Sequence, residues 1–223
     1  MNLRDIFGKW MDFLDEDMLL KYRNMLMQCV SNNIPIEPSP GRVFDCFKLT
    51  PAEELKVVIL GQDPYFDGAA TGLAFANDST KTGIKKLSPS LGVIVKSVES
   101  LSDNPKNTIF DLTLESWAKQ GILLLNSALT VKRGVPGSHT QAWNPFIERL
   151  LVAISAQTNA CFLLLGKTAW AFKDCIFDNE RGVFMEYHPA YYARNNIPMP
   201  NTIWKNMLEY VKENYGVTLK LYE

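Results

Sequence analysis

The sequence lacks a surplus of charge of either sign. Lysine and arginine total 23 against 24 aspartates and glutamates, so the formal net charge is −1. Proteins that bind nucleic acid through a field spread over the whole surface are usually strongly basic. The composition therefore excludes that mode of binding, and any affinity for DNA must come from a local group of basic side chains.

The chain is also poor in metal ligands and in long apolar runs. Its two histidines and four cysteines show no CxxC spacing, so we expect free thiols, no metal site and no cofactor. No apolar run approaches the roughly 20 residues that a membrane helix needs, and acidic residues such as Asp12 and Asp15 interrupt the N-terminus. We expect a protein of the cytoplasm or nucleus that is neither secreted nor in a membrane.

Short apolar runs alternate with segments of helical periodicity, which is typical of a parallel sheet covered by helices. We therefore predict an α/β fold: a single domain over residues 1–223 with a central parallel four-stranded sheet flanked by helices, an α/β/α sandwich. Residues 1–40 are expected to form a helical N-terminal segment with a Pro-rich connector, and residues 41–215 the core that carries the site. The predicted strands are Lys56–Gly61, Ile122–Asn126, Cys161–Gly166 and Val183–His188, and apolar residues at helical spacing stand near 18–30, 90–101, 146–154 and 203–211.

Polar residues stand where each predicted strand ends: Asp63, Asn126, Lys167 and His188. In an open parallel sheet the binding crevice lies outside the carboxyl ends of the strands, so these side chains are expected to converge. Taken singly, each has an ordinary explanation: Asp63 suits a turn before Pro64, and a lone histidine is most often a hydrogen-bonded core residue. Their joint placement favours a site.

Five motifs in order make the chain similar to a known family. They are Gly61–Tyr65 (GQDPY), Gly72–Phe75 (GLAF), Leu87–Leu91 (LSPSL), Trp117–Asn126 (ending LLLN) and His188–Pro189. Together they resemble the main uracil-DNA glycosylase family. That resemblance implies an enzyme that flips uracil out of DNA and hydrolyses its bond to the sugar, as in base excision repair.

The resemblance also implies the catalytic roles. Asp63 would position the attacking water and stabilise the cationic sugar that forms as the base departs. His188 would donate a hydrogen bond to the uracil oxygen on which negative charge grows.

Four further positions would hold the base. Asn126 would read the uracil edge, Phe75 would stack on the flipped ring, and Tyr65 would exclude a thymine methyl group. Backbone amides at Gln62 would complete the pocket.

Contacts to single- or double-stranded uracil-containing DNA are expected from loops on the same rim. The resemblance assigns them to Ser88, Pro89, Ser90, Gly166, Lys167, Tyr191, Tyr192 and Arg194, and the sequence adds basic residues nearby at Lys85, Lys86, Lys132 and Arg133. We further expect a monomer, and an inhibitor protein that mimics uracil or DNA as a second kind of partner.

Three positions depart from the family pattern. Phe66 replaces the usual histidine, Lys167 replaces a typical serine, and Tyr192 stands where the family has a leucine wedge. These departures leave two alternatives open: a non-catalytic member that binds DNA or protein, and a relative with a different base specificity.

Overall fold

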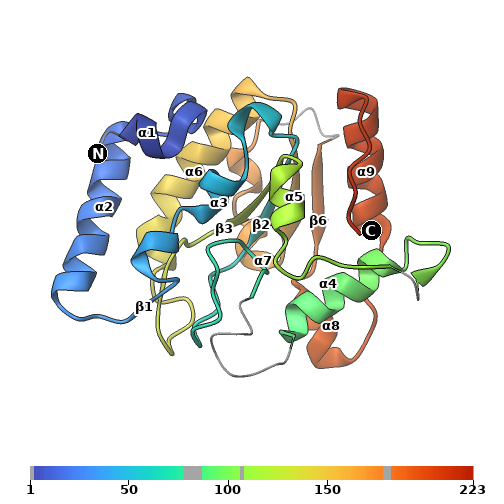
Figure 1. The fold of residues 1–223 in the computed structure, drawn as a ribbon, viewed down its shortest axis with the longest axis horizontal. Helices are drawn as coiled ribbons and strands as arrows, with labels where there is room; N and C mark the ends of the chain where they lie inside the picture. Colours follow the sequence, from blue (N-terminus) through green and yellow to red (C-terminus); the bar gives the residue numbers. More distant parts are fainter. Residues whose placement is uncertain (1–2, 78–86, 106–107, 178–181, 223) are drawn as a thin grey trace.

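The protein is described by a computed structural model that covers residues 3–77, 87–105, 108–177 and 182–222. Figure 1 shows a central sheet between two groups of helices. Its strands run parallel in the order β3-β2-β5-β6. They are β2 (Val57–Gly61), β3 (Ile122–Asn126), β5 (Cys161–Leu165) and β6 (Val183–Glu186). The predicted α/β/α architecture is confirmed, with strand ends within two residues of those expected.

Alternate residues of each strand face opposite helical layers, because successive side chains of a strand point to opposite sides of the sheet. Val58 and Leu60 belong to the core that contains apolar residues of α2 (Glu16–Ser31) and α6 (Thr140–Gln157). Val57 and Ile59 belong to the core that contains α4 (Pro89–Glu99) and α9 (Thr202–Tyr215). Burial on both faces explains why the strands are almost wholly apolar.

Each of the four sequence segments with apolar residues at helical spacing corresponds to one of these long helices. The short helix α1 (Leu3–Phe7) lies in the expected helical N-terminal segment. The sequence did not predict the other short helices: α3 (Asp45–Leu49), α5 (Glu115–Lys119), α7 (Lys167–Trp170) and α8 (Pro189–Asn195). The described residues also form the 3-10 turns η1 (Gly8–Asp12), η2 (Pro40–Arg42), η3 (Ala52–Glu54) and η5 (Lys173–Cys175). Among the described residues, no helix combines the length and the apolar character needed to cross a membrane.

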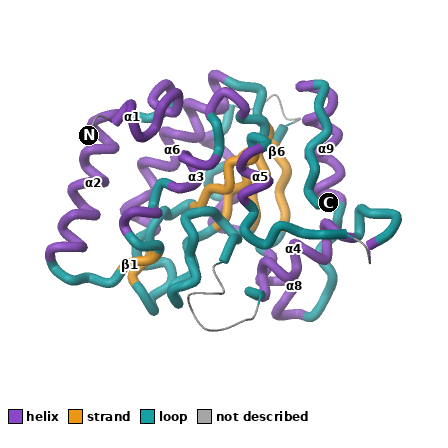
Figure 2. The backbone as a smooth tube through the Cα atoms, viewed as in Figure 1, coloured by secondary structure: helices purple, strands orange, loops and turns teal. Residues whose placement is uncertain are grey.

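Several contacts join the N-terminal segment to the rest of the fold, among them the Trp10 N–H, which donates to the Thr50 carbonyl at 2.8 Å. The ring of Tyr22 on α2 stacks on Trp143 of α6 with centroids 4.2 Å apart. The Pro-rich connector contains β1 (Ile36–Glu37), which pairs antiparallel with β4 (Val131–Lys132) and is visible in orange below α2 in Figure 2.

The pairing of β1 with β4 also brings Arg133, one of the residues expected to contact DNA, beside a buried carboxylate. The guanidinium of Arg133, in the loop after β4, donates to the carboxylate of Glu37, whose side chain is 5% exposed. A buried carboxylate without this partner would be costly, so Arg133 compensates Glu37. The Arg133 side chain is itself 60% exposed, and its contact with DNA stays a prediction.

Candidate active site

Six residues assigned from the sequence to chemistry and base recognition line one cavity of about 110 Å³. They are Gln62, Asp63, Tyr65, Phe75, Asn126 and His188, and the wall is completed by Pro64, Phe66, Ala70, Leu73, Ala76 and Ser90. The cavity lies where β2, β3 and β6 end, which is the carboxyl edge of the sheet. Residues up to 126 positions apart, from Gln62 to His188, are thus brought together by the parallel topology.

Asp63 accepts a hydrogen bond from the backbone N–H of Gly137, with Oδ2 2.6 Å from the nitrogen. Burial raises the pKa of Asp63 above its ordinary value, and the hydrogen bonds from Gly137 and from its own backbone lower it in part. The carboxylate is therefore held in place but poorly solvated, which suits a group that must take a proton. Sequence reasoning missed Gly137, because a backbone donor has no residue-type signature.

Gly61 allows two side chains to close over the end of β2. A Cβ atom at Gly61 would lie 2.9 Å from Oδ1 of Asn126 and 3.0 Å from the ring of Phe75. The loop that carries Phe75 is fixed to β3, since Ala74 N–H donates to the Leu124 carbonyl at 3.1 Å. The amide of Asn126 and the ring of Phe75 therefore meet in the cavity, and the Phe75 and His188 rings lie 5.6 Å apart.

The Tyr65 hydroxyl group is held by a chain of hydrogen bonds. Its oxygen lies 3.0 Å from the Phe75 carbonyl, which can only accept, and 2.5 Å from the Ser88 hydroxyl. Tyr65 therefore donates to Phe75, and Ser88 donates to Tyr65 while accepting from the Leu91 N–H at 3.1 Å. Burial raises the pKa of Tyr65 to about 12, so the phenol keeps the proton that this chain uses.

Ser88 has a structural role in this chain of hydrogen bonds. Its side chain caps helix α4 and orients Tyr65, and the residue is 8% exposed. Both hydrogen-bonding functions of its hydroxyl group are therefore used inside the protein, and the expected contact of this segment with a DNA phosphate stays a prediction.

His188 is held as a neutral donor. The backbone N–H of Ala190 donates to Nδ1 at 3.1 Å, so the neutral ring carries its proton on Nε2. Burial, with a smaller contribution from the charge of Arg194, lowers the pKa of His188 to about 4. The glycine turn after β5 makes room for this side chain, since a Cβ atom at Gly166 would lie 2.7 Å from the His188 Cβ.

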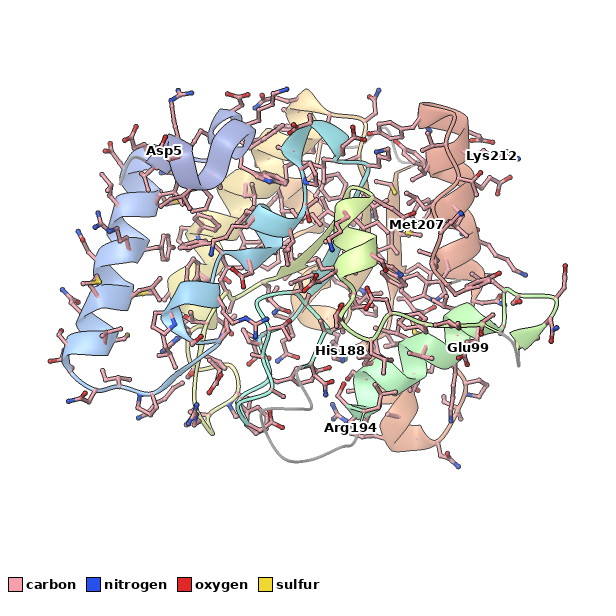
Figure 3. All side chains as sticks on the ribbon, in the orientation of Figure 1. Asp5, Glu99, His188, Arg194, Met207 and Lys212 are labelled. Carbon is pink, nitrogen blue, oxygen red and sulfur yellow. The ribbon has the colours of Figure 1, made fainter. Side chains whose placement is uncertain are left out.

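The remaining residues expected on DNA are divided between the rim and the interior. Pro89, Lys167, Tyr191 and Arg194 are exposed, whereas Ser90 is buried and lines the cavity. Figure 3 places Arg194 at the same end of the molecule as His188, far from Asp5 and Lys212. Lys85 and Lys86 lie outside the described residues.

The Tyr192 ring, which stands at the family's wedge position, is buried. It is 5% exposed, and its hydroxyl group donates to Oε1 of Glu186 at 2.5 Å. Burial and the Glu186 carboxylate both raise the pKa of Tyr192. The adjacent Tyr191, with 42% of its surface exposed, is the ring that this loop presents to solvent.

The family model described as "Uracil DNA glycosylase superfamily" matches residues 47–212, which include every residue of the cavity. The chain belongs to the uracil DNA glycosylase superfamily. A uracil-DNA glycosylase of Borrelia turicatae is 34% identical over 219 residues, covering 94% of this chain and 95% of the relative.

Solved structures of uracil-DNA glycosylases share the fold. The crystal structure of mimivirus uracil-DNA glycosylase superposes with a TM-score of 0.82 at 21% identity, covering 99% of this chain and 89% of that one. A mimivirus UNG variant in complex with UGI superposes with a TM-score of 0.79 at 20% identity, covering 100% of this chain and 91% of that one.

Within this uracil DNA glycosylase fold, the described residues contain no cluster of three or more side chains suited to bind a metal ion.

Proposed function

We propose that the protein is a uracil-DNA glycosylase, which hydrolyses the bond between uracil and deoxyribose in DNA and leaves an abasic site. The observation that carries the proposal is the single cavity in which Asp63, Asn126, His188, Tyr65 and Phe75 meet. Belonging to the superfamily supports the reaction class, and the cavity supports the substrate.

The reaction replaces the carbon–nitrogen bond with a carbon–oxygen bond. As the carbon–nitrogen bond breaks, its electron pair goes to the uracil ring. The Nε2–H of His188 donates a hydrogen bond to the uracil carbonyl oxygen on which negative charge grows. Asp63 stabilises the cationic sugar, orients water toward the sugar carbon and accepts the proton that the water loses. A neutral His188 serves this role because it leaves the Asp63 charge free to act on the sugar.

Base selection follows from the cavity walls. The Asn126 amide can accept from the uracil N–H and donate to the adjacent carbonyl, whereas cytosine presents the reverse pattern and would leave buried polar groups unpaired. Tyr65, fixed by Ser88 and Phe75, excludes the thymine methyl group by shape. Phe75 stacks on the base whatever its identity.

The test is release of uracil from an oligonucleotide with one uracil, followed by alkaline cleavage of the abasic site. Thymine and cytosine substrates are run beside it, in EDTA and at low salt, because phosphate contacts weaken as salt rises. We expect cleavage at uracil alone, and a loss of at least about 100-fold in Asp63→Asn, since general-base groups contribute 10²- to 10⁴-fold.

Asp67→Asn is the matched control. Asp67 is exposed, lies four residues from Asp63 and accepts a local hydrogen bond from Ala69, at 3.1 Å. Its rate should equal that of the wild type. Absence of cleavage by folded wild-type protein that still binds DNA would instead favour a non-catalytic member of the family.

The proposal extends to partners and organisation. We propose that the chain acts as a monomeric single domain in the cytoplasm or nucleus, on single- or double-stranded DNA. The UGI complex of the mimivirus UNG variant supports a protein inhibitor that would occupy the same cavity here.

A further inference from the structure

The loop between β4 and α6, residues 133–139, reaches the carboxylate of Asp63; we call it the clamp loop. The backbone N–H of its Gly137 donates to Oδ2 of Asp63 at 2.6 Å. The Gly137 carbonyl accepts from the N–H of Thr140, the first residue of α6, at 3.3 Å. Gly137 has φ +74°, a conformation that favours glycine and leaves the peptide free to turn. The direction of its N–H therefore depends on how the two ends of the clamp loop are held.

The first end of the clamp loop is fixed to the N-terminal connector and to the turn after β2. The Arg133 N–H donates to the Pro35 carbonyl at 3.0 Å, and the guanidinium group pairs with the buried carboxylate of Glu37. The N–H of Gly134 donates to the Phe66 carbonyl at 2.9 Å. This end of the loop is held by backbone groups that do not depend on the residue types around the cavity.

The second end of the clamp loop depends on one buried hydroxyl group. Thr130, which is 0% exposed, accepts from the indole N–H of Trp143 at 2.7 Å, and its oxygen lies 3.0 Å from Nδ1 of His139. A hydroxyl group can accept one hydrogen bond while donating another, so it serves both partners. The Trp143 ring is itself stacked on Tyr22 with centroids 4.2 Å apart. Thr130 thus joins the last residue of the loop to a rigid part of the core.

The hydrogen bond from Gly137 affects the charge of Asp63 as well as its orientation. Burial raises the pKa of Asp63, and the Gly137 N–H lowers it, because the hydrogen bond stabilises the ionised form. The other titratable side chains of the cavity, Tyr65 and His188, are held by partners outside the clamp loop. A displaced loop would therefore act on Asp63 in particular.

We propose that Thr130 is a positioning residue for Asp63, which acts through His139 to keep the Gly137 N–H on the carboxylate. The inference rests on the proposed function for the role of Asp63 as the base. The hydrogen bond that it explains exists in the free protein and can be measured without DNA. It gives a part in the reaction to a side chain that does not line the cavity.

The test is an NMR titration of the free protein. The carbon resonance of the Asp63 carboxyl group gives its pKa, and the amide proton resonance of Gly137 reports the hydrogen bond. Thr130→Val keeps the size of the side chain but removes the hydroxyl group. We expect the pKa of Asp63 to rise by about one unit, the scale of one hydrogen bond to a charged group, and the Gly137 resonance to move.

Uracil excision should follow the same order among the variants. Thr130→Val should be slower than the wild type by at least about 10-fold, because a small displacement of a catalytic group is costly. Thr130→Ser restores the hydroxyl group and should return the excision rate, the Asp63 pKa and the Gly137 resonance close to their wild-type values. A Thr130→Ser variant that behaves like Thr130→Val would overturn the role of the hydroxyl group.

Ser97→Ala is the matched control for stability. Ser97 is 4% exposed, accepts from the indole N–H of Trp204 at 2.9 Å and donates to the Pro200 carbonyl at 3.1 Å. Like Thr130→Val, this change leaves a buried tryptophan N–H without its acceptor, so both variants should lose stability. Ser97→Ala should leave the Asp63 pKa and the Gly137 resonance unchanged. An equal shift in both variants would mean that the shift reports stability alone.

A second variant covers the case in which Thr130→Val does not fold. His139→Phe removes the connection at the loop end and keeps the hydrogen bond between Trp143 and Thr130. It should raise the Asp63 pKa and move the Gly137 resonance in the same direction as Thr130→Val. Folded variants that leave both quantities at their wild-type values would overturn the positioning role.

Excision by the wild type separates this proposal from the proposed function. If the wild type excises uracil while Thr130→Val and His139→Phe match Ser97→Ala in pKa, resonance and rate, the positioning role fails and the enzyme stands. If the two variants shift the Asp63 pKa but the folded wild type excises nothing, the control of Asp63 by Thr130 stands and the proposed function fails.

Discussion

The hydrogen bond at Nδ1 of His188 determines which ring nitrogen carries the proton. Since Nδ1 accepts from the Ala190 N–H, the donor that faces the substrate is Nε2, and protonation of Nδ1 would cost that hydrogen bond. The sequence predicted the position of this histidine at a strand end. It did not predict the tautomer, which depends on the backbone of the helix that follows.

This arrangement predicts a pH dependence of stability. The ordinary pKa of histidine is 6.5 and that of His188 in the folded protein is about 4. Between these values the unfolded chain binds a proton that the folded chain excludes, so the free energy of unfolding should fall as pH falls from about 6.5 to 4. Urea denaturation at pH 7 and at pH 4.5 should show a smaller fall for His188→Gln than for the wild type. Equal falls would contradict the assigned pKa shift.

The sequence predicted that side chains at the strand ends converge, but it did not predict which side chains of the neighbouring loops are buried. Asp63, Asn126 and His188 all line the cavity as expected. Tyr192 and Ser88, both expected to contact DNA, are buried and donate hydrogen bonds inside the protein; their contact with DNA stays a prediction. A sequence motif gives the position of a residue along the chain. The direction in which its side chain points depends on hydrogen-bond partners that are distant in the sequence or that the family motif does not include.

At the scale of elements, the turn after β5 positions the helix that follows β6. Gly166 has φ +98°, a conformation that other residues rarely adopt, and its N–H donates to the Glu186 carbonyl at 2.8 Å. A side chain here would meet His188 as well as strain the backbone. The two neighbouring strands thus define one active-site wall.

Gly166→Ala should therefore reduce uracil excision by at least about 10-fold and cost about 1–3 kcal/mol of stability, the usual cost of such backbone strain. Excision rates and urea denaturation measure the two effects. Gly216→Ala is the control, because Gly216 has φ +68° but nothing lies within 4 Å of its added Cβ. It should lose stability without a specific loss of excision, and an equal loss of rate in both would refute a role in positioning His188.

Helices and strands could be predicted from the sequence where the segment is long enough to show a regular apolar pattern. The parallel strands and the four long helices follow from apolar spacing. Strand β1 was hidden in a Pro-rich connector, since its two residues pair with β4 almost a hundred positions away. Helix α8 has only seven residues, too few to show a helical period.

At the scale of the whole molecule, the N-terminal segment contributes directly to the core beneath the sheet. Tyr22 is 3% exposed, stacks on Trp143 and donates to the Ala142 carbonyl at 2.6 Å. Trp143 in turn donates to Thr130, which follows β3 on the way to Gly137 and the Asp63 carboxylate. The sequence predicted a helical segment here but not its packing partners.

Tyr22→Ala should cost about 3–5 kcal/mol of unfolding free energy, as large aromatic truncations in cores do. Tyr22→Phe keeps the ring and should cost only about 1 kcal/mol, the contribution of one hydrogen bond. Urea denaturation of the two variants gives both values. A loss below about 1 kcal/mol in Tyr22→Ala would show that the N-terminal segment is peripheral to the core.

The hydroxyl chain from Leu91 through Ser88 and Tyr65 to Phe75 has an evolutionary consequence. Each hydroxyl group both donates and accepts, so the residues at positions 65 and 88 are chemically interdependent. Among relatives of this chain, a change of Ser88 to a residue without a hydroxyl group should accompany a different anchor for the tyrosine. Such covariation would show that relatives conserve a fixed position of the tyrosine ring, which excludes the thymine methyl group.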